Sequence, residues 1–284
     1  MSKKAIVTGA SRGIGRAIAV SLANSGYDVA FTYAHAKAEA EKTKQLIEDA
    51  GQKAYMIQVD YKDKNAAESS TREGIALLGG VDAIVCNAAI SDGAVHIDNL
   101  LVYEKERMQE LITVNLWSYW ICARTAARNM VKNQVKGNIV FITSVEGITS
   151  MPGMFLYGSL KAATKRSCMT IALDLAPYGI RCNCVAPGFT TVRTTEELHA
   201  QGEKDVEWRA ILAKRYPLGR VGIPEDTANM VEFLLRDESS NITGEQFRVD
   251  GAARTPRMPT WPIKKEIEKS GWCYSEMVAP KSDW

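Results

Sequence analysis

The sequence predicts an α/β fold, a doubly wound parallel sheet covered by helices on both faces. Short apolar runs alternate with amphipathic helical stretches along most of the 284 residues, and the first run leads into a glycine-rich turn that opens a helix. Strands that alternate with helices pair in parallel through right-handed crossovers. Because no internal repeat or low-complexity linker interrupts the pattern, we expect one domain over residues 1–252 and an extension over residues 253–284.

Composition narrows the class of protein. Hydrophobic residues make up 46% of the chain and charged residues 24%, with a formal net charge of +2. These values are ordinary for a globular enzyme and argue against a dedicated nucleic-acid or membrane-surface binder. Six cysteines without C-x-x-C spacing and three scattered histidines predict no metal site. The start, Met1-Ser-Lys-Lys, is too short for a signal peptide, so we expect a cytoplasmic protein.

The first strand and helix enclose the glycine-rich turn. Lys4–Thr8 is an apolar strand, Thr8–Gly15 reads T-G-A-S-R-G-I-G, and Arg16–Asn24 has helical periodicity. Glycines let the backbone approach a pyrophosphate, and the helix N-terminus offers N–H groups and a partial positive charge. This strand–turn–helix setting predicts a nucleotide-binding loop.

The later elements continue the alternation. We expect strands at Asp28–Tyr33, Ala54–Asp60, Asp82–Asn87, Asn138–Thr143, Arg181–Ala186 and Gln246–Asp250. We expect helices at Ala36–Ala50, about Asn65–Leu78, about Tyr103–Lys132 and Phe155–Ala176. Ligands of such sheets bind outside the carboxyl ends of the strands. The glycine turn, Asn87, Ser144 and Pro187 all fall at those ends.

A candidate acid–base pair lies on the helix that begins at Phe155. Tyr157 and Lys161 are four residues apart and share one helix face. An ammonium beside a phenol favours the phenolate, so we expect Lys161 to lower the pKa of Tyr157. Ser144 follows the apolar run Ile139–Thr143, where its hydroxyl could hold a carbonyl oxygen that Tyr157 protonates. Tyr-x-x-x-Lys alone is common on surface helices. It indicates an acid–base pair here because the other motifs occur with it.

These motifs together resemble the short-chain dehydrogenase/reductase family over roughly residues 3–252. The matching segments are the glycine turn, Asn87-Ala-Ala89, Asn115, Ser144, Tyr157-x-x-x-Lys161, Pro187-Gly188, Pro217–Glu225 and Thr243–Gly251. The resemblance implies a Rossmann-type domain that transfers a hydride between a nicotinamide and the carbonyl or secondary alcohol of a substrate. It implies that Tyr157 moves the proton, Lys161 holds the nicotinamide ribose, Ser144 holds the substrate oxygen, and Asn115 holds a proton-relaying water.

The resemblance also implies a set of coenzyme-binding residues. They are Gly9, Ser11, Arg12, Gly13, Ile14, Gly15, Tyr33, Asp60, Tyr61, Asn87, Tyr157, Lys161, Pro187, Gly188 and Thr190. The chain departs from the family in three ways. Ala89 replaces a usual glycine, Val192 stands where many relatives have a threonine (so Thr190 or Thr191 is expected to serve), and about 30 residues follow the usual end.

The coenzyme is expected to be NADP(H). An NAD site usually has Asp or Glu at the end of the second strand. Here the segment Phe31–Ala36 contains no acid, and the next is Glu39. Arg12 lies in the glycine turn, where relatives use a guanidinium to pair a 2′-phosphate, and His35 and Lys37 add positive charge.

The substrate is expected to be a hydrophobic, steroid-like or otherwise bulky ketone or alcohol. The lining candidates between Ser144 and Tyr157 are Ile148, Met151, Met154, Phe155 and Leu156, and residues 190–216 resemble the family's substrate lid. The apolar lid residues Leu198, Val206, Trp208, Ile211 and Leu212 fit a substrate contact or lid packing equally. Alternatives are 3-oxoacyl-carrier-protein reduction, which the absence of arginines at Asn138 and Tyr178 disfavours, and sugar or polyol oxidation. A nucleotide-sensing regulator is the non-enzymatic alternative, disfavoured by the intact catalytic set.

Assembly and the extension complete the expectations. Relatives pair their two long helices across a twofold axis, so a homotetramer is implied, with Trp117, Trp120 and Met169 as interface candidates. The extension holds Trp261, Trp272 and Trp284, whereas disordered tails are poor in aromatic residues. We expect it to dock, either closing a substrate cleft or only packing on the body or a neighbour.

Overall fold

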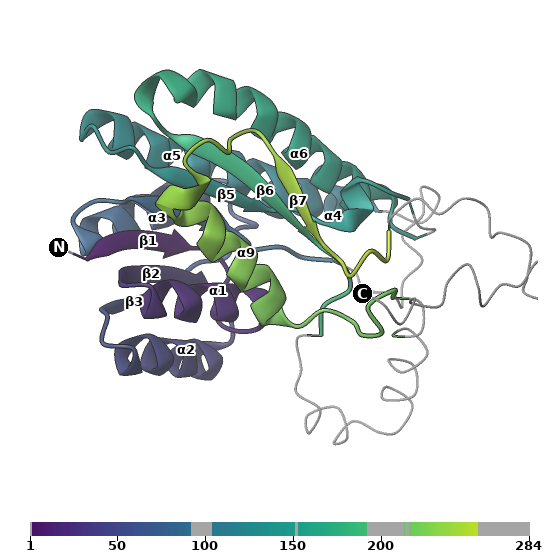
Figure 1. The fold of residues 1–284 in the computed structure, drawn as a ribbon, viewed down its shortest axis with the longest axis horizontal. Helices are drawn as coiled ribbons and strands as arrows, with labels where there is room; N and C mark the ends of the chain where they lie inside the picture. The colour runs from purple at the N-terminus through teal and green to yellow at the C-terminus, as the bar shows by residue number, and fades with distance from the viewer. Residues whose placement is uncertain (1, 92–103, 151–152, 192–212, 214–215, 255–284) are drawn as a thin grey trace, which may run out of the picture. The chain divides into compact units, whose positions relative to one another are not determined.

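In the computed structural model, seven parallel strands form one sheet in the order β3-β2-β1-β4-β5-β6-β7. Figure 1 shows β3, β2 and β1 toward one side of the sheet and β5, β6 and β7 toward the other. The structure describes residues 2–91, 104–150, 153–191, 213 and 216–254. The strands are β1 (Lys3–Val7), β2 (Tyr27–Tyr33), β3 (Ala54–Gln58), β4 (Ala83–Cys86), β5 (Asn138–Ile142), β6 (Arg181–Pro187) and β7 (Gln246–Val249). The predicted doubly wound parallel sheet is confirmed.

The strand order reverses between β1 and β4. From β1 the chain first builds outward to β2 and β3, then returns to place β4 on the other side of β1. Val7, at the end of β1, pairs with Phe31 of β2 and with Val85 of β4. The loops that leave β1 and β4 therefore diverge at one edge of the sheet, and this switch point is where open α/β sheets bind ligands.

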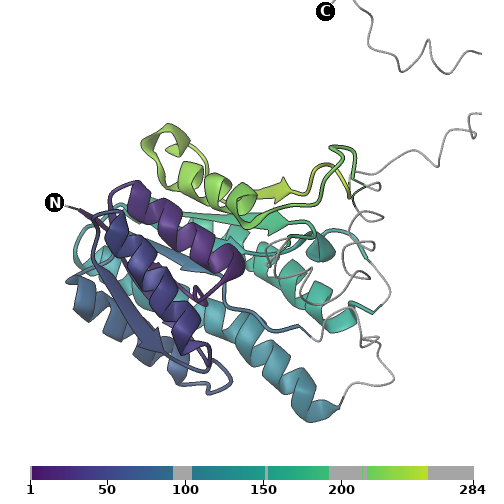
Figure 2. The ribbon, with the colours of Figure 1, turned by 90° about the horizontal axis from the view of Figure 1, so that it is seen from below.

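Two helical layers cover the sheet (Figure 2). Helices α1, α2 and α9 lie on one face, whereas α3, α4, α5 and α6 lie on the other. Their bounds are α1 (Gly13–Asn24), α2 (Lys37–Asp49), α3 (Ala66–Leu78), α4 (Lys105–Ile112), α5 (Ser118–Lys132), α6 (Phe155–Leu175) and α9 (Pro224–Leu235). Short helical turns are η1 (Thr113–Trp117), η2 (Val145–Gly147), η3 (Ala176–Tyr178) and η4 (Asp237–Ser239).

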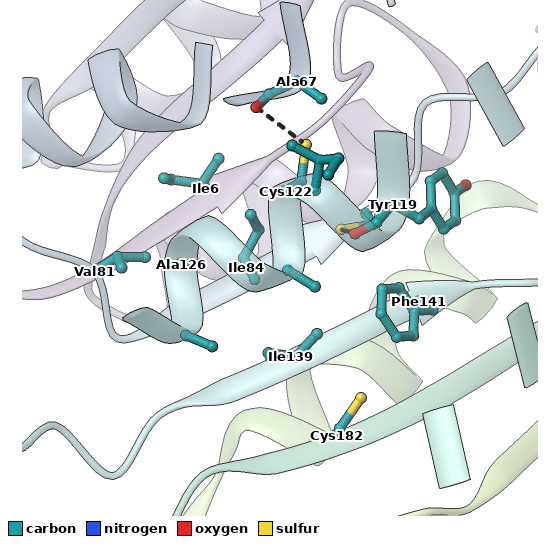
Figure 3. Close-up of a cluster of buried hydrophobic side chains, with 14 of the residues drawn as sticks. Ile6, Ala67, Val81, Ile84, Tyr119, Cys122, Ala126, Ile139, Phe141 and Cys182 are labelled. Carbon is teal, nitrogen blue, oxygen red and sulfur yellow. Dashed lines mark hydrogen bonds between the residues drawn. The ribbon is translucent and has the colours of Figure 1, made fainter. Parts of the chain in front are cut away.

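Strand β5 shows how the sequence divides the core. Ile139 and Phe141 pack in the cluster on the α3–α5–α6 face, shown in Figure 3. Val140 and Ile142 pack in the cluster beneath α1 and α9. Because alternate residues of a strand point to opposite faces, an uninterrupted apolar run is required when helices cover both.

The long helix predicted from Tyr103 to Lys132 is interrupted. The structure has α4, a π-helical segment η1 and α5 in its place, and Tyr103 itself lies outside the described residues. Single π turns inside helices are uncommon and often mark functional sites. The turn contains the buried Asn115, whose amide is held by backbone atoms of Ile90. Periodicity could not reveal this turn, because its buried residues also fit an α-helix.

Helix α9 was not predicted from the apolar pattern. Its N-terminal signals are present in the sequence, since Pro224 occupies the first turn and the Asp226 carboxylate accepts a hydrogen bond from the Ile223 N–H (2.9 Å). Arg220 donates to both oxygens of the same carboxylate at 2.6 and 2.7 Å. Proline at the first helical positions followed by an acid is a typical helix start.

Five of the seven predicted strands run past their actual carboxyl ends, whereas β2 ends at Tyr33 as predicted and β6 continues one residue further, to Pro187. Thr8, Asn87 and Thr143 were placed in strands, but each lies beyond the last ladder residue. Their polar groups instead make contacts across the sheet edge: Thr8 Oγ1 accepts from the Asn87 N–H (2.8 Å), and Thr143 Oγ1 donates to the Val185 carbonyl (3.0 Å). Helix α1, by contrast, begins three residues earlier than expected, at Gly13.

Two further findings concern the whole chain. By contacts, it divides into Met1–Ala253 and Arg254–Trp284. Within the part that the structure describes, no helix has the length and apolar character needed to cross a membrane. The expected aromatic extension beyond Arg254, and the lid residues 192–212, lie outside the described residues.

Candidate functional site

The carboxyl edge of β1 is fixed to that of β4 by Asn87 and Thr8. The Asn87 side-chain amide donates to the carbonyls of Thr8 and Gly9, both at 3.0 Å. The N–H of Ala88 donates to Thr8 Oγ1 (3.0 Å), and the Gly9 N–H donates to Thr32 Oγ1 at the end of β2 (2.9 Å). Three neighbouring strands therefore hold the start of the glycine turn in one conformation.

The glycine turn forms a cradle that larger residues would fill. Gly9 has φ +67°, and a Cβ there would lie 2.8 Å from the Cα of Ala88. A Cβ at Gly15 would lie 2.6 Å from Asn87 Nδ2. Helix α1 begins at Gly13 without a side-chain cap, which leaves its first N–H groups directed at the loop. Close backbone approach and an open helix N-terminus suit a pyrophosphate, so the predicted residues Gly9–Gly15 fit a dinucleotide.

The acid that follows β2 is already engaged by cations. One oxygen of the Glu39 carboxylate lies 2.7 Å from Arg16 Nη2 and the other 2.6 Å from Lys42 Nζ. Hydrogen bonds from Lys42 and Arg16 lower the pKa of Glu39 to about 2. Arg16 also reaches the Ser11 carbonyl and Thr43 Oγ1, which ties α2 to the glycine turn. Arg12 is exposed at the N-terminal boundary of α1.

The predicted coenzyme residues near β2 and β3 differ in their exposure. Tyr33 is buried at the end of β2, and Asp60 is exposed, its carboxylate accepting from the Lys62 N–H (3.0 Å). Tyr61 is buried in the core, and its hydroxyl lies 3.2 Å from Thr32 Oγ1. A ligand at this edge can therefore reach Asp60 from solvent, whereas the Tyr61 ring packs inside.

Ser144 and the short turn η2 are pressed against α6. The Ser144 hydroxyl accepts a hydrogen bond from the Glu146 N–H (3.1 Å), which fixes the turn. A Cβ at Gly147 would lie 2.7 Å from the Ala162 nitrogen, and one at Gly158 would lie 2.8 Å from the Glu146 carbonyl oxygen. Two glycines thus allow the backbones to touch, which brings Ser144 and Glu146 beside Tyr157.

Tyr157 is held as a neutral phenol in the protein alone. Burial raises its pKa, hydrogen bonding to Ser144 lowers it, and the charge of Glu146 raises it. The expectation that Lys161 would pull this pKa down is wrong for the protein without coenzyme. The physical reason is the direction of the ammonium, which donates to other acceptors and lies 5.6 Å from the Tyr157 ring centre.

Lys161 is almost completely enclosed. It is 1% exposed, and its Nζ donates to the Ile142 carbonyl (2.8 Å) and to the hydroxyl of Tyr119 (3.1 Å). Burial lowers its pKa to about 7. A lysine that titrates near neutrality is unusual for a structural residue and typical of an active site.

Asn115 holds the loop that follows β4. Its Oδ1 accepts from the Ile90 N–H (2.9 Å) and its Nδ2 donates to the Ile90 carbonyl (2.8 Å). Both polar ends of the side chain are therefore used by one backbone residue. The side-chain amide holds this loop against the helix. A water that relays protons would therefore have to bind to atoms of Asn115 outside the side-chain amide.

The loop after β6 closes the remaining side of the edge. The Gly188 N–H donates to the Val249 carbonyl (2.9 Å), and a Cβ at Gly188 would lie 2.9 Å from the Asp250 Cβ. Thr190 Oγ1 donates to the Gly188 carbonyl (3.1 Å). The Tyr216 hydroxyl accepts a hydrogen bond from the Phe189 N–H (2.9 Å). Tyr216, the last residue of the predicted lid, therefore anchors the loop after β6. Pro187 is buried at the end of β6.

Four residues of the site were missed by sequence reasoning: Thr8, Thr32, Tyr119 and Tyr216. Thr8 is the last residue of one predicted strand and Thr32 the next to last of another, which is a usable signal. Tyr119 follows Asn115 by four residues in the same predicted helix, so it could have been placed on the same helix face as that candidate residue. Tyr216 carried no signal. Among the described residues, no group of three His, Cys, Asp or Glu side chains could hold a metal ion.

The glycine cradle, the neutral phenol and the buried lysine meet at one sheet edge, and comparisons place this arrangement in a family. The family model described as enoyl-(acyl carrier protein) reductase matches residues 9–252. The chain belongs to the short-chain dehydrogenase/reductase family. Members use nicotinamide coenzymes, so this chain is an oxidoreductase of that type.

The matches to relatives of this short-chain dehydrogenase/reductase extend over nearly the whole length of each relative. It is 36% identical to a 3-oxoacyl-[acyl-carrier-protein] reductase of Staphylococcus aureus, over 88% of this chain and 98% of the relative. It is 34% identical to an L-2,3-butanediol dehydrogenase of Corynebacterium glutamicum, with the same coverage. The crystal structure of an acetoin dehydrogenase from Enterobacter cloacae superposes with a TM-score of 0.81 at 30% identity, covering 93% of this chain and 99% of the other.

Proposed function

We propose that this protein is an NADP(H)-dependent carbonyl reductase and alcohol dehydrogenase that interconverts a hydrophobic ketone and its secondary alcohol. The observation that carries the proposal is the convergence of Ser144, Tyr157 and Lys161 beside the glycine cradle. A proton donor, a hydroxyl that can hold an oxygen, and a cation adjoin a site suited to a dinucleotide. These are the parts that carbonyl reduction requires.

Each side chain has a part in this reaction. When bound, the nicotinamide coenzyme supplies the hydride for reduction or accepts it in oxidation. The Ser144 hydroxyl holds the substrate oxygen in line with Tyr157, whose phenol gives its proton to that oxygen during reduction. The remaining N–H of Lys161 would hold the coenzyme ribose, and in the complex its charge would favour the phenolate left on Tyr157. Asn115 keeps the loop after β4 in place, and proximity supplies most of the rate.

The coenzyme preference follows from the charges around the end of β2. Glu39 is the first acid after this strand end, and Arg16 and Lys42 hold its carboxylate. His35 and Lys37 are exposed just after β2, and Arg12 is exposed in the glycine turn. A 2′-phosphate would gain a charge-assisted contact from Arg12, whereas a free 2′-hydroxyl would find no free carboxylate at Glu39.

The substrate mouth offers apolar side chains. Ile148 is 40% exposed and Phe155 is 43% exposed, although both are large apolar residues that flank Ser144 and Tyr157 in the sequence. Met154 is half-buried between them in the sequence, and Met151 lies outside the described residues. Leu156 was also expected to line the mouth, but it is buried against Leu111 and Leu160 and belongs to the packing. Exposed apolar side chains at this place support a hydrophobic ketone.

A second candidate is reduction of a 3-oxoacyl thioester on a carrier protein. The relative from Staphylococcus aureus carries that name and supports the candidate. A small diol, acyloin or sugar substrate is supported in the same way by the butanediol and acetoin dehydrogenases and by a rhamnose dehydrogenase. All these substrates present a carbonyl or secondary alcohol to the same three side chains.

A coenzyme-oxidation assay separates the candidates. We would follow NADPH and NADH absorbance with a steroid ketone, an aromatic ketone, a 3-oxoacyl carrier-protein thioester and acetoin, and NADP⁺ reduction with a polyol and a sugar. The proposal expects the highest kcat/KM with NADPH and a bulky apolar ketone. A dominant rate with the thioester would establish the second candidate, and NADPH binding without turnover of any compound would contradict both.

Assembly, compartment and the extension belong to the same proposal. We expect a cytoplasmic homotetramer formed through the outer faces of η1, α5 and α6, where Trp117 of η1 and Met169 and Leu173 of α6 are exposed apolar side chains. The extension is proposed to close a substrate cleft. An enzyme that stops after Ala253 should keep its assembly and show a higher KM for its best bulky substrate. Unchanged kcat and KM would show that the extension has no such role.

A further inference from the structure

Tyr119, a buried tyrosine on α5, contacts Lys161 at the carboxyl end of β5. The Tyr119 hydroxyl accepts a hydrogen bond from Lys161 Nζ at 3.1 Å and donates one to the Ile142 carbonyl at 3.3 Å. Lys161 Nζ donates to the same carbonyl at 2.8 Å. Two side chains and one strand carbonyl therefore form a closed triangle at the carboxyl end of β5.

The Tyr119 ring is fixed by its packing. It is 1% exposed and lies parallel to the Phe141 ring, with a centroid distance of 5.9 Å and an interplanar angle of 13°. Figure 3 shows the two rings next to each other at one end of the buried cluster. The Lys161 nitrogen also lies 4.8 Å from the Tyr119 ring centre, within reach of a cation–π contact.

The donors of Lys161 can be counted. An ammonium has three N–H groups, of which Tyr119 and Ile142 accept two. Among the described residues, the third has no protein acceptor. The tyrosine and the carbonyl therefore set the orientation of the ammonium and leave one donor for a ligand at the open edge.

We propose that Tyr119 is a positioning residue for the reaction, because its hydroxyl orients Lys161 and keeps it in the ammonium form. The inference rests on the proposed function for its catalytic consequence, but its structural part concerns the protein alone. Burial opposes the charge on Lys161, and hydrogen bonds to the charged form offset that cost. Tyr119 itself stays neutral, since burial raises the pKa of its phenol well above the ordinary value.

The decisive variant is Tyr119→Phe, which keeps the ring and its stacking but removes the acceptor. Loss of a hydrogen bond to a charged group is worth on the order of tenfold or more in an equilibrium, which corresponds to about one pH unit. We expect Lys161 to titrate about one unit lower in coenzyme-free Tyr119→Phe than in the native protein. The measurement is ¹³C NMR of labelled lysine, with Lys161→Met to assign the signal.

Two further readouts concern the coenzyme and the reaction. NADPH binding, followed by tryptophan fluorescence, should weaken in Tyr119→Phe more at high pH than at low pH, because the ammonium is lost earlier. The alkaline limb of kcat/KM should move to lower pH by the same amount, with an overall loss on the order of tenfold near neutrality.

A matched control distinguishes positioning from packing. Phe141→Leu removes the stacked ring and leaves the Tyr119 hydroxyl, so it should lower Tm without moving the titration of Lys161. Tyr119→Met, which also lacks the hydroxyl, provides the same test if the phenylalanine variant does not fold. An unchanged Lys161 titration in the variants without the hydroxyl, or an equal shift in Phe141→Leu, would overturn the inference. A shifted lysine in a protein that turns over none of the ketones would instead refute the proposed function and leave the inference standing.

Discussion

The ammonium nitrogen of Lys161 lies 5.6 Å from the centre of the Tyr157 ring, one helical turn away on α6. This nitrogen donates to Tyr119 and to Ile142, so in the protein alone burial is the main influence on the protonation of Tyr157, the proposed proton donor. A phenol that keeps its proton is ready to protonate a carbonyl oxygen. In the proposed reaction, the site is therefore prepared for reduction before any ligand arrives.

Removal of the Tyr157 hydroxyl should abolish most turnover and spare coenzyme binding. Tyr157→Phe retains the ring and loses only the proton donor, so kcat should fall by a factor on the order of a hundred or more. NADPH affinity by fluorescence should stay within about twofold. Tyr178→Phe, at an exposed tyrosine of η3, is the control. A near-native kcat in Tyr157→Phe would remove this residue from the mechanism.

Arg12 should determine the choice of coenzyme. Arg12→Ala loses a charge-assisted contact worth about 1.5–3 kcal/mol, so KM for NADPH should rise about ten- to a hundredfold while KM for NADH changes little. Arg166→Ala, at an exposed arginine of α6, serves as the control for a lost positive charge. Equal changes for both coenzymes, or a native preference for NADH, would contradict the assignment.

The carboxylate of Glu146 should set the pH at which the alcohol is oxidised. Oxidation needs the phenolate of Tyr157, whose pKa is raised by burial and by the charge of Glu146 and lowered by Ser144. Glu146→Gln removes the negative charge, so the rising limb of kcat for oxidation should move to lower pH. Glu73→Gln, on the exposed side of α3, should leave the profile in place. An unmoved limb in Glu146→Gln would show that the charge does not act on Tyr157.

Lys161 should cost the protein stability near neutral pH. Burial lowers its pKa from 10.5 to about 7, so the folded state binds its proton more weakly than the unfolded chain does. The cost is complete below about pH 7 and shrinks as the pH rises toward 10.5. Lys161→Met should therefore raise Tm at about pH 6, where each kcal/mol is worth about 2–4 °C in chains of this size, and raise it less at about pH 9.5.

Two controls accompany the Lys161 measurement. Lys165→Met changes an exposed lysine one turn further along α6 and should leave Tm unchanged at both pH values. Lys161→Met should be inactive with every ketone, because the cation proposed to hold the coenzyme is absent. A drop in Tm at low pH would show that the hydrogen bonds to Tyr119 and Ile142 outweigh the burial of the charge.

The exposed face of α6 should mediate assembly. Leu173 is 76% exposed and Met169 is 47% exposed, and their spacing of four residues places them on one helix face. Met169→Glu with Leu173→Glu should convert the proposed tetramer to smaller species in light scattering, because the paired faces would bury like charges. Leu46→Glu, at an exposed leucine of α2, should not. A native protein that is monomeric at micromolar concentration would contradict the proposed assembly.

The sequence by itself determined the parallel sheet, its helical layers and the edge at which the site lies. Apolar runs such as Ile139–Ile142 must be buried on both faces, and alternation with helices then leaves few topologies. Glycines at positions 9, 13 and 15 directly after a strand are typical of a nucleotide-binding loop. The roles proposed for Ser144, Tyr157 and Lys161 came from residue types and motif order, and the placement of Tyr157 and Lys161 on one helix face came from their spacing of four.

Tertiary structure alone decided the protonation states and the companions of those residues. The direction of the Lys161 ammonium depends on Tyr119 and on the carbonyl of Ile142. No spacing rule along α6 can predict a contact with a backbone carbonyl of β5. The π turn at Asn115 and the burial of Tyr61 are likewise results of packing. Burial shifts a pKa as strongly as a neighbouring charge does. The sequence could therefore name the phenol and the lysine, but only the enclosed site shows that the phenol keeps its proton and that the lysine titrates near neutrality.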